Sequence, residues 1–315
     1  MPHNPLDHAL FAPTGLRAGA VLAAALLLIL ILERGRPRPD SPLFQRLSSW
    51  AVMAPVFTAA VLTGGAAALA LVVFMTVQAL REYAGLVRLA RVYAGLLIAY
   101  GVFGLGVTAW WGQRFFLFLP LGFFALAALL PLVRLARGPD ESRTPYGELL
   151  QLAAMVLGYL WIPMFLSYFV LIQRTEDEGA AILLLLGFAV ALSDVFAFTL
   201  GKLLRGPRLA TGVSPNKTWA GAAGNLVGAY VGFSIMGFAT PAEWSSATRI
   251  VLPAVVALAA LYGDLIESLV KRGFGVKDAG GLLPGFGGLL DRIDSLLVAL
   301  PIGYYAMKVL QHYTA

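Results

Sequence analysis

The chain has no cysteine, and its three histidines, His3, His8 and His312, all lie near its ends. The absence of cysteine excludes disulfide bonds, cysteine zinc sites and thiol nucleophiles. Histidines placed in this way make a histidine metal cluster or a histidine catalytic dyad unexpected. Candidate chemistry is therefore left to carboxylates, hydroxyls and basic side chains.

Charge is scarce as well. Only 13% of the 315 residues are charged and 59% are hydrophobic, whereas soluble domains average about 25% charged and about 45–50% apolar residues. This composition excludes a soluble enzyme, a disordered chain and a coiled coil, and it predicts an all-α, polytopic membrane protein. The net charge of +6 is typical of basic cytoplasmic loops, so no nucleic-acid partner is expected.

A membrane-spanning helix needs about 20 mostly apolar residues. The segment 47–80 is too long for one upright helix, and Thr63-Gly64-Gly65 in its middle predicts a turn between two short helices. With this hairpin we expect about ten membrane helices. The other candidate spans are 16–33, 92–110, 115–133, 149–172, 180–200, 219–239, 248–268 and 294–312.

The basic residues favour the hairpin over a single span. With a hairpin, one membrane face carries every Lys and Arg except Arg17, Arg114, Arg174, Arg249 and Lys308. A single span would divide the basic residues between the two faces. The positive-inside rule then places both termini outside and the basic loops in the cytoplasm. We expect a protein of a bacterial inner membrane whose active site faces the cytoplasm.

The apolar runs, together with the placement of the carboxylates, predict three parts of the chain. Residues 1–46 form an additional membrane helix and a basic, proline-rich linker. Residues 47–180 form the N-terminal membrane helices. Residues 181–315 form a catalytic membrane region with active-site loops at its cytoplasmic face.

Carboxylates are concentrated in this last part, and several interrupt apolar runs. An ionisable group at membrane depth costs at least a few kcal/mol unless it is paired or hydrated, so such a group marks a candidate site. Structural pairing between helices is the alternative interpretation. The residues concerned are Asp194, Asp264, Glu267, Asp278, Asp291 and Asp294.

Their spacing predicts a metal site. Asp264 and Glu267 are three residues apart, as are Asp291 and Asp294, so each pair shares one face of a helix. Two such pairs facing each other would offer the oxygen ligands that Mg²⁺ prefers. The glycine-rich run 280–288 would let backbone N–H groups approach a ligand. Phosphate oxygens would be bound by Lys271, Arg272, Lys277 and Arg292; a charge-neutralised loop is the alternative.

A second motif precedes this one. Ser193-Asp194 is expected to end a membrane helix, and a basic loop follows. The run Ser214-Pro215-Asn216-Lys217-Thr218 is then expected to open the next helix. Free N–H groups, hydroxyls and a lysine at a helix start are typical of phosphate binding.

Segment 263–295 closely resembles the signature of phosphatidate cytidylyltransferases, also called CDP-diacylglycerol synthases. Ser193-Asp194 and the run 214–218 are similar to upstream elements of the family, and the strong match covers roughly 190–300. The matching signature residues are Ser268, Lys271-Arg272, Lys277-Asp278, Pro284-Gly285-Phe286-Gly287-Gly288, Asp291-Arg292 and Asp294-Ser295.

Two positions depart from the family pattern. Phe286 stands where the family usually has His, and Ala220 stands where an acidic or amide residue is usual. Because a phosphate monoester is already anionic near pH 7, its attack hardly needs a histidine base. We therefore expect an active but divergent member.

The resemblance implies transfer of a cytidylyl group from CTP to phosphatidate, giving CDP-diacylglycerol and pyrophosphate for phospholipid synthesis. Its partners would be CTP, phosphatidate or a related lipid phosphate, and membrane lipids; a homodimer stays open. It implies catalytic roles for Asp264, Lys277, Asp278, Asp291 and Arg292, and substrate binding by Ser193, Asp194, Ser214, Lys217, Thr218, Ser268, Lys271 and Arg272. It implies Mg²⁺ on Asp264, Glu267, Asp291 and Asp294, with K⁺ as a second cation.

Three other functions remain open from the sequence. A CTP-dependent lipid-alcohol kinase would release CDP instead of pyrophosphate. A catalytically impaired paralogue would fit the departures at Phe286 and Ala220. An ion-coupled transporter or channel is disfavoured, because transporters more often show broken helices in two repeated halves and this chain concentrates its charge in one half.

Overall fold

The computed structural model describes residues 4–32, 41–136, 144–175, 178–276, 279–280 and 287–314. These residues are almost entirely helical, as expected where lipid offers no hydrogen-bond partners and helices satisfy their own backbone. The helices are α1 (Phe11–Leu32), α2 (Pro42–Thr63), α3 (Gly65–Leu86), α4 (Arg91–Trp111), α5 (Phe118–Ala136), α6 (Pro145–Trp161), α7 (Pro163–Gln173), α8 (Gly179–Leu204), α9 (Trp219–Ile235), α10 (Ser246–Gly273) and α11 (Leu290–Thr314). Short 3₁₀ turns lie at Pro5–Asp7, Gly112–Phe115 and Gly237–Ala239.

The predicted all-α polytopic membrane fold is confirmed. Eight helical segments within the described residues are long and apolar enough to cross a membrane, counting α6 and α7 as one. The apolar part of α2, Leu47–Thr63, is shorter, and α9 has 17 residues. These two helices complete the set of segments expected from the sequence.

The hairpin between α2 and α3 has the predicted turn but longer arms. Gly64 and Gly65 have φ values of 64° and 48°, which L side chains rarely adopt, so glycine suits both positions. Each arm has 22 residues, so the hairpin runs from Pro42 to Leu86 and not over 47–80. The extension at the first arm follows from Ser41, whose Oγ accepts the Phe44 N–H at 3.1 Å and caps α2.

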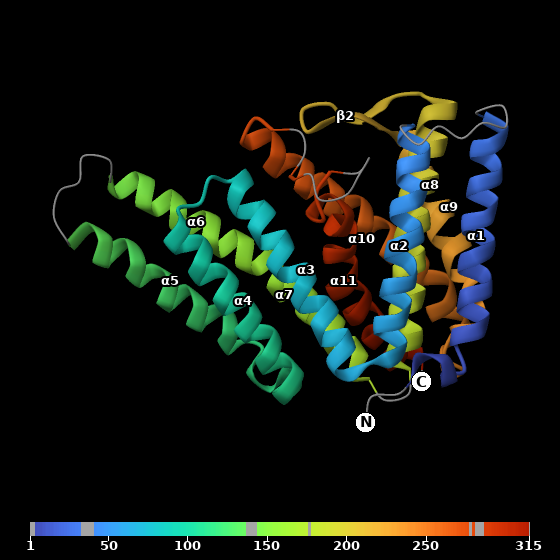
Figure 1. The fold of residues 1–315 in the computed structure, drawn as a ribbon, viewed down its shortest axis with the longest axis horizontal. Helices are drawn as coiled ribbons and strands as arrows, with labels where there is room; N and C mark the ends of the chain where they lie inside the picture. The colour runs from blue at the N-terminus through green and yellow to red at the C-terminus, as the bar shows by residue number, and fades with distance from the viewer. Residues whose placement is uncertain are drawn as a thin grey trace.

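The two chain termini lie at one end of the molecule (Figure 1). Successive membrane segments alternate in direction, with α6 and α7 forming one segment, so the β-hairpin and the connection from α10 to α11 lie at the opposite end. The described basic residues of that opposite end are Arg46, Arg81, Arg88, Arg91, Arg134, Lys202, Arg205, Arg208, Lys217, Lys271, Arg272 and Arg292. The helical order therefore groups the basic residues as the sequence predicts.

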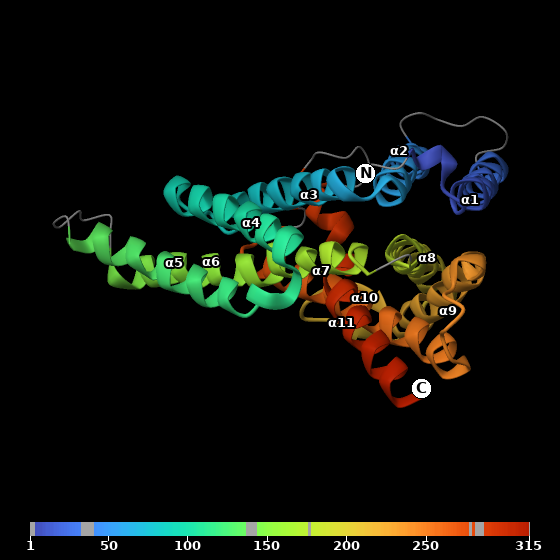
Figure 2. The ribbon, with the colours of Figure 1, turned by 90° about the horizontal axis from the view of Figure 1, so that it is seen from below.

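Close helix packing brings the last four helices together. Gly224, Gly228 and Gly232 line the face of α9 that packs on α8 (Figure 2), and a methyl group at Gly228 would overlap the Leu192 carbonyl oxygen. Such a four-residue repeat of small residues lets two backbones approach closely. Gly263 plays the same part between α10 and α11, where a methyl group would overlap the Asp294 carbonyl oxygen.

Two expectations about the upstream motif are wrong. Ser193-Asp194 does not end a helix, because α8 continues to Leu204 through a further run of mostly apolar residues. The run Ser214–Thr218 is not a helix start but strand β2, paired antiparallel with β1 (Arg208–Ala210). α9 begins directly after this strand, at Trp219, because Thr218 caps the helix: its Oγ1 accepts the Gly221 N–H at 3.1 Å.

The predicted span 149–172 is also interrupted. It consists of α6 and α7, which are separated at Ile162. Pro163 has no N–H and its ring crowds the preceding turn, so the proline ends one helix and starts the next.

Candidate active site

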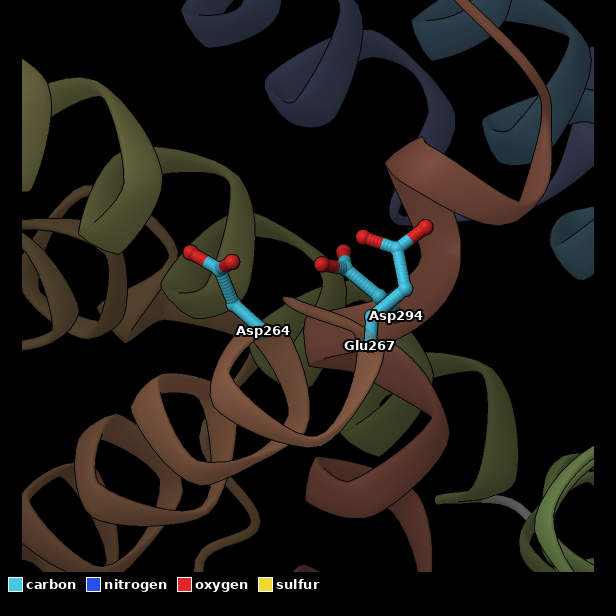
Figure 3. Close-up of side chains that lie close together, drawn as sticks. All are labelled: Asp264, Glu267 and Asp294. Atoms are coloured by element: carbon cyan, nitrogen blue, oxygen red, sulfur yellow. The ribbon is translucent and has the colours of Figure 1, made fainter. Parts of the chain in front are cut away.

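Three carboxylates converge where α10 and α11 cross. Asp264 and Glu267 come from successive turns of α10 and Asp294 comes from α11 (Figure 3). One carboxylate oxygen of each residue lies within 4.8 Å of the other two. Glu267 and Asp294 are buried, and Asp264 is partly exposed. Gly263 makes this cluster possible, because its missing side chain lets the two helices touch beside Asp264.

Two lysines border the cluster. Lys217 reaches over from β2 and places its Nζ 2.6 Å from Asp264 Oδ2. Lys271 lies one turn beyond Glu267 on α10, with its Nζ 2.6 Å from Glu267 Oε2 and 2.7 Å from Asp291 Oδ1. Buried carboxylates are tolerated at membrane depth when paired in this way. The site thus combines hard oxygen ligands with cations at its edge.

Asp291 is held beside the cluster by other donors. Its Oδ2 accepts the Gly288 N–H at 2.8 Å and the Ala279 N–H at 3.1 Å, while Oδ1 faces Lys271. Of Asp291 and Asp294, it is Asp294 that lies in the cluster with Asp264 and Glu267. Direct metal binding by Asp291 stays a prediction.

Hydroxyl groups connect the cluster to its surroundings. Ser268 donates to Asp264 Oδ1 at 3.4 Å. Ser295 donates to Asp194 Oδ1 at 3.3 Å, so Asp194 approaches the site from α8. Ser193 instead donates to the Asn225 carbonyl oxygen at 3.0 Å, which joins α8 to α9.

The remaining predicted site residues are more peripheral. Thr218 caps α9 and Ser214 lies half-buried in β2. Arg272 is exposed at the end of α10, and Arg292 lies half-buried in the first turn of α11. Five predicted positions lie outside the described residues, namely the site residues Lys277 and Asp278 and the signature residues Pro284, Gly285 and Phe286.

A family model described as the cytidylyltransferase family matches residues 44–310. The chain belongs to this family. The predicted family resemblance is therefore confirmed, and α1 precedes the matched region.

Similar proteins carry a more specific description. The chain is 38% identical over 162 residues to a phosphatidate cytidylyltransferase of Mycobacterium leprae (strain TN), covering 50% of each chain. It is 40% identical over 136 residues to one of Brucella abortus biovar 1 (strain 9-941), covering 42% of this chain and 49% of the other. An uncharacterized protein of Escherichia coli (strain K12), YnbB, is 31% identical over 238 residues, covering 73% of this chain and 75% of YnbB. The chain spans about half the length of the two phosphatidate cytidylyltransferases.

The structure adds a role for Glu82, a residue at the end of the α2–α3 hairpin to which the sequence assigned no function. This buried carboxylate lies on α3 but accepts the backbone N–H groups of Leu289 and Leu290 at the start of α11. Glu82 directly follows Arg81 at the end of the apolar segment 47–80, so the sequence did not mark it as a buried carboxylate. Its partner could not be inferred, because the contact joins residues separated by 207 positions in the sequence.

A second buried carboxylate is also paired, but away from the cluster. Glu148 on α6 lies 3.0 Å from Arg134 Nε on α5 and accepts the hydroxyl of Tyr93 on α4. α5 and the start of α6 lie apart from α10 and α11 (Figure 1). Glu148 thus connects three helices outside the candidate site.

Proposed function

We propose that this protein is an integral-membrane phosphatidate cytidylyltransferase. The observation that carries the proposal is the convergence of Asp264, Glu267 and Asp294 with two lysines in a chain of the cytidylyltransferase family. The names of its Mycobacterium and Brucella relatives support the choice of phosphatidate as the acceptor.

The proposed reaction is a displacement at the α-phosphorus of CTP. A phosphate oxygen of phosphatidate forms a bond to this phosphorus. The bond between the phosphorus and the oxygen that bridges the α- and β-phosphates breaks, and pyrophosphate leaves with the electron pair. The attacking phosphate monoester has a second pKa of about 6 and is largely dianionic at neutral pH. The protein therefore has to position and neutralise phosphates more than to remove a proton.

The donor set fits a divalent cation. Three buried or half-buried carboxylates with oxygens close together match the oxygen preference of Mg²⁺. We assign Asp264, Glu267 and Asp294 as the residues that would hold Mg²⁺, with Asp291 at the edge and K⁺ as a second cation. A bound metal would supply charge stabilisation to the triphosphate and the leaving group.

The basic side chains have positions that suit phosphate binding. Lys217 and Lys271 border the carboxylates from β2 and α10, and Arg272 and Arg292 lie at the adjoining helix ends. We propose that they neutralise the phosphates of CTP and of the lipid. The positive-inside rule supports an orientation with this end of the protein in the cytoplasm of a bacterium, where CTP is available.

The test is an assay of the purified protein in phospholipid with CTP, Mg²⁺ and phosphatidate, in which pyrophosphate and CDP-lipid are measured. We expect pyrophosphate and CDP-lipid in equal amounts, and no transfer by Asp264→Asn protein purified in the same way. Release of CDP with a lipid alcohol as acceptor would support the CTP-dependent lipid-alcohol kinase. The absence of any product at every Mg²⁺ concentration would contradict both the cytidylyltransferase and the kinase activity.

A further inference from the structure

Glu82 joins the N-terminal helices to the start of the catalytic helix. Its Oε2 accepts the Leu290 N–H at 2.8 Å, and its Oε1 accepts the Leu289 N–H at 3.0 Å. Gln78, one turn earlier on α3, donates its Nε2 to the same Oε1 at 2.8 Å. The side chain is 8% exposed, and no ion pair to it occurs among the described residues.

These contacts satisfy the free backbone donors at the start of α11. The first N–H groups of a helix have no partner within the helix, and the helix dipole favours a negative charge there. Glu82 takes the N–H groups of Leu289 and Leu290, while Asp291 takes that of Gly288. Two carboxylates from distant parts of the chain therefore fix one helix start.

Glycines make room for the Glu82 carboxylate. A Cβ at Gly280 would lie 2.9 Å from Glu82 Cδ, closer than ordinary contact, and a Cβ at Gly288 would overlap Glu82 Oε2. Both positions belong to the glycine-rich run in which the sequence predicts ligand binding. Gly280 and Gly288 are therefore required because a side chain at either position would collide with the Glu82 carboxylate.

We propose that Glu82 is a positioning residue for the catalytic centre. Its contacts end one residue before Asp291 and four residues before Asp294, which joins the carboxylate cluster. A shift of the first turn of α11 would move Asp294 relative to Asp264 and Glu267. The catalytic part of this inference rests on the proposed function, whereas the fixing of α11 does not.

The experiment compares Glu82→Gln with Glu82→Asp and a matched control, Glu148→Gln. The Glu82→Gln side chain would point an NH₂ group at one backbone N–H and would lose the charge, whereas Glu82→Asp would keep the charge on a shorter side chain. Glu148→Gln makes the same chemical change at a buried carboxylate that lies outside the site. The full chain is used, and hydrogen exchange and steady-state kinetics are both measured.

We expect Glu82→Gln to raise hydrogen exchange at least about fivefold in residues 287–297 and to leave exchange in α8 unchanged. We expect kcat for cytidylyl transfer to fall at least about tenfold with little change in the KM for CTP, because binding groups remain while alignment is lost. For Glu82→Asp we expect both the exchange rate in residues 287–297 and kcat to lie between the values of wild type and Glu82→Gln. Glu148→Gln should leave exchange in residues 287–297 and kcat near wild type.

Wild-type exchange in Glu82→Gln, or equal opening of residues 287–297 in Glu148→Gln, would overturn the inference. Increased exchange with an unchanged kcat would overturn the positioning role. If Glu82→Gln fails to fold, Glu82→Asp provides the comparison. If wild type transfers no cytidylyl group, the proposed function fails, and the exchange data alone decide whether Glu82 fixes α11.

Discussion

Lys271 contacts two carboxylates at once, Glu267 on its own helix and Asp291 on the next. Lys217 contacts Asp264 from the β-hairpin. At the scale of residues, the cluster is therefore a set of carboxylates bordered by cations that offset part of their charge. Removing one member leaves the charge of another uncompensated, which is costly in a low-dielectric environment.

Asp264→Asn should reduce cytidylyl transfer at least about 100-fold, because an amide lacks the negative charge with which the carboxylate would hold Mg²⁺. The fold should survive, since the Asp264 side chain is 38% exposed and its neutralisation relieves repulsion from the nearby carboxylates of Glu267 and Asp294. Pyrophosphate release measures activity, and the detergent elution profile checks the fold. Near-wild-type turnover would contradict the metal assignment.

Phe286→His should keep activity or change it only modestly. The attacking lipid phosphate has a pKa of about 6, so a general base has little to contribute, although such bases supply about 10²–10⁴-fold where a proton must move. Rates with CTP and phosphatidate at pH 7 provide the test. An inactive wild type that gains activity by orders of magnitude from this change would support the impaired-paralogue interpretation.

At the scale of elements, the approach of α10 to α11 decides where the carboxylates lie. This contact occurs at Gly263, immediately before Asp264. The α8–α9 pair uses a glycine repeat for the same purpose, and Ser193 adds a hydrogen bond across it. The distance between α10 and α11, and therefore the geometry of the site, is set by a glycine that takes no part in the reaction.

Gly263→Ala should separate α10 from α11 and lower activity at least about tenfold, since overpacking of this kind costs about 1–3 kcal/mol. Its midpoint of thermal unfolding should fall as well. Gly273→Ala is the matched control, because it lies on the same helix and a Cβ there meets nothing within 4 Å. Equal effects of the two substitutions would show that helix contact at Gly263 is not the cause.

At the scale of the whole molecule, the termini and the candidate site lie at opposite ends (Figure 1). The basic residues gather at the end that carries the site. This asymmetry predicts the orientation in the membrane, and it assigns the hairpin loop at Thr211 and the turn at Gln113 to opposite faces.

Thr211→Cys should be labelled by a membrane-impermeant thiol reagent only after the cytoplasmic face is opened, whereas Gln113→Cys should be labelled in intact cells. Both positions are exposed, and the chain has no native cysteine to give a background signal. The positive-inside rule is the physical reason for the expectation. The reverse pattern of labelling would place the site on the outer face.

The amino-acid sequence alone determined the membrane class, the α2–α3 hairpin and the pairing of Asp264 with Glu267 on one helix face. These properties depend on hydropathy, on glycine at a turn and on a spacing of three residues, which all act locally. Sequence reasoning misplaced the end of α8 and the run Ser214–Thr218, because it took the motif boundaries as helix boundaries.

Only the tertiary structure decided which faces meet. It brought Asp294 to Asp264 and Glu267, placed Asp291 on backbone donors, and joined Glu82 to the start of α11. Periodicity specifies a face of one helix and not its partner. The partner depends on how closely two backbones approach, which is set by steric contacts between residues far apart in the chain.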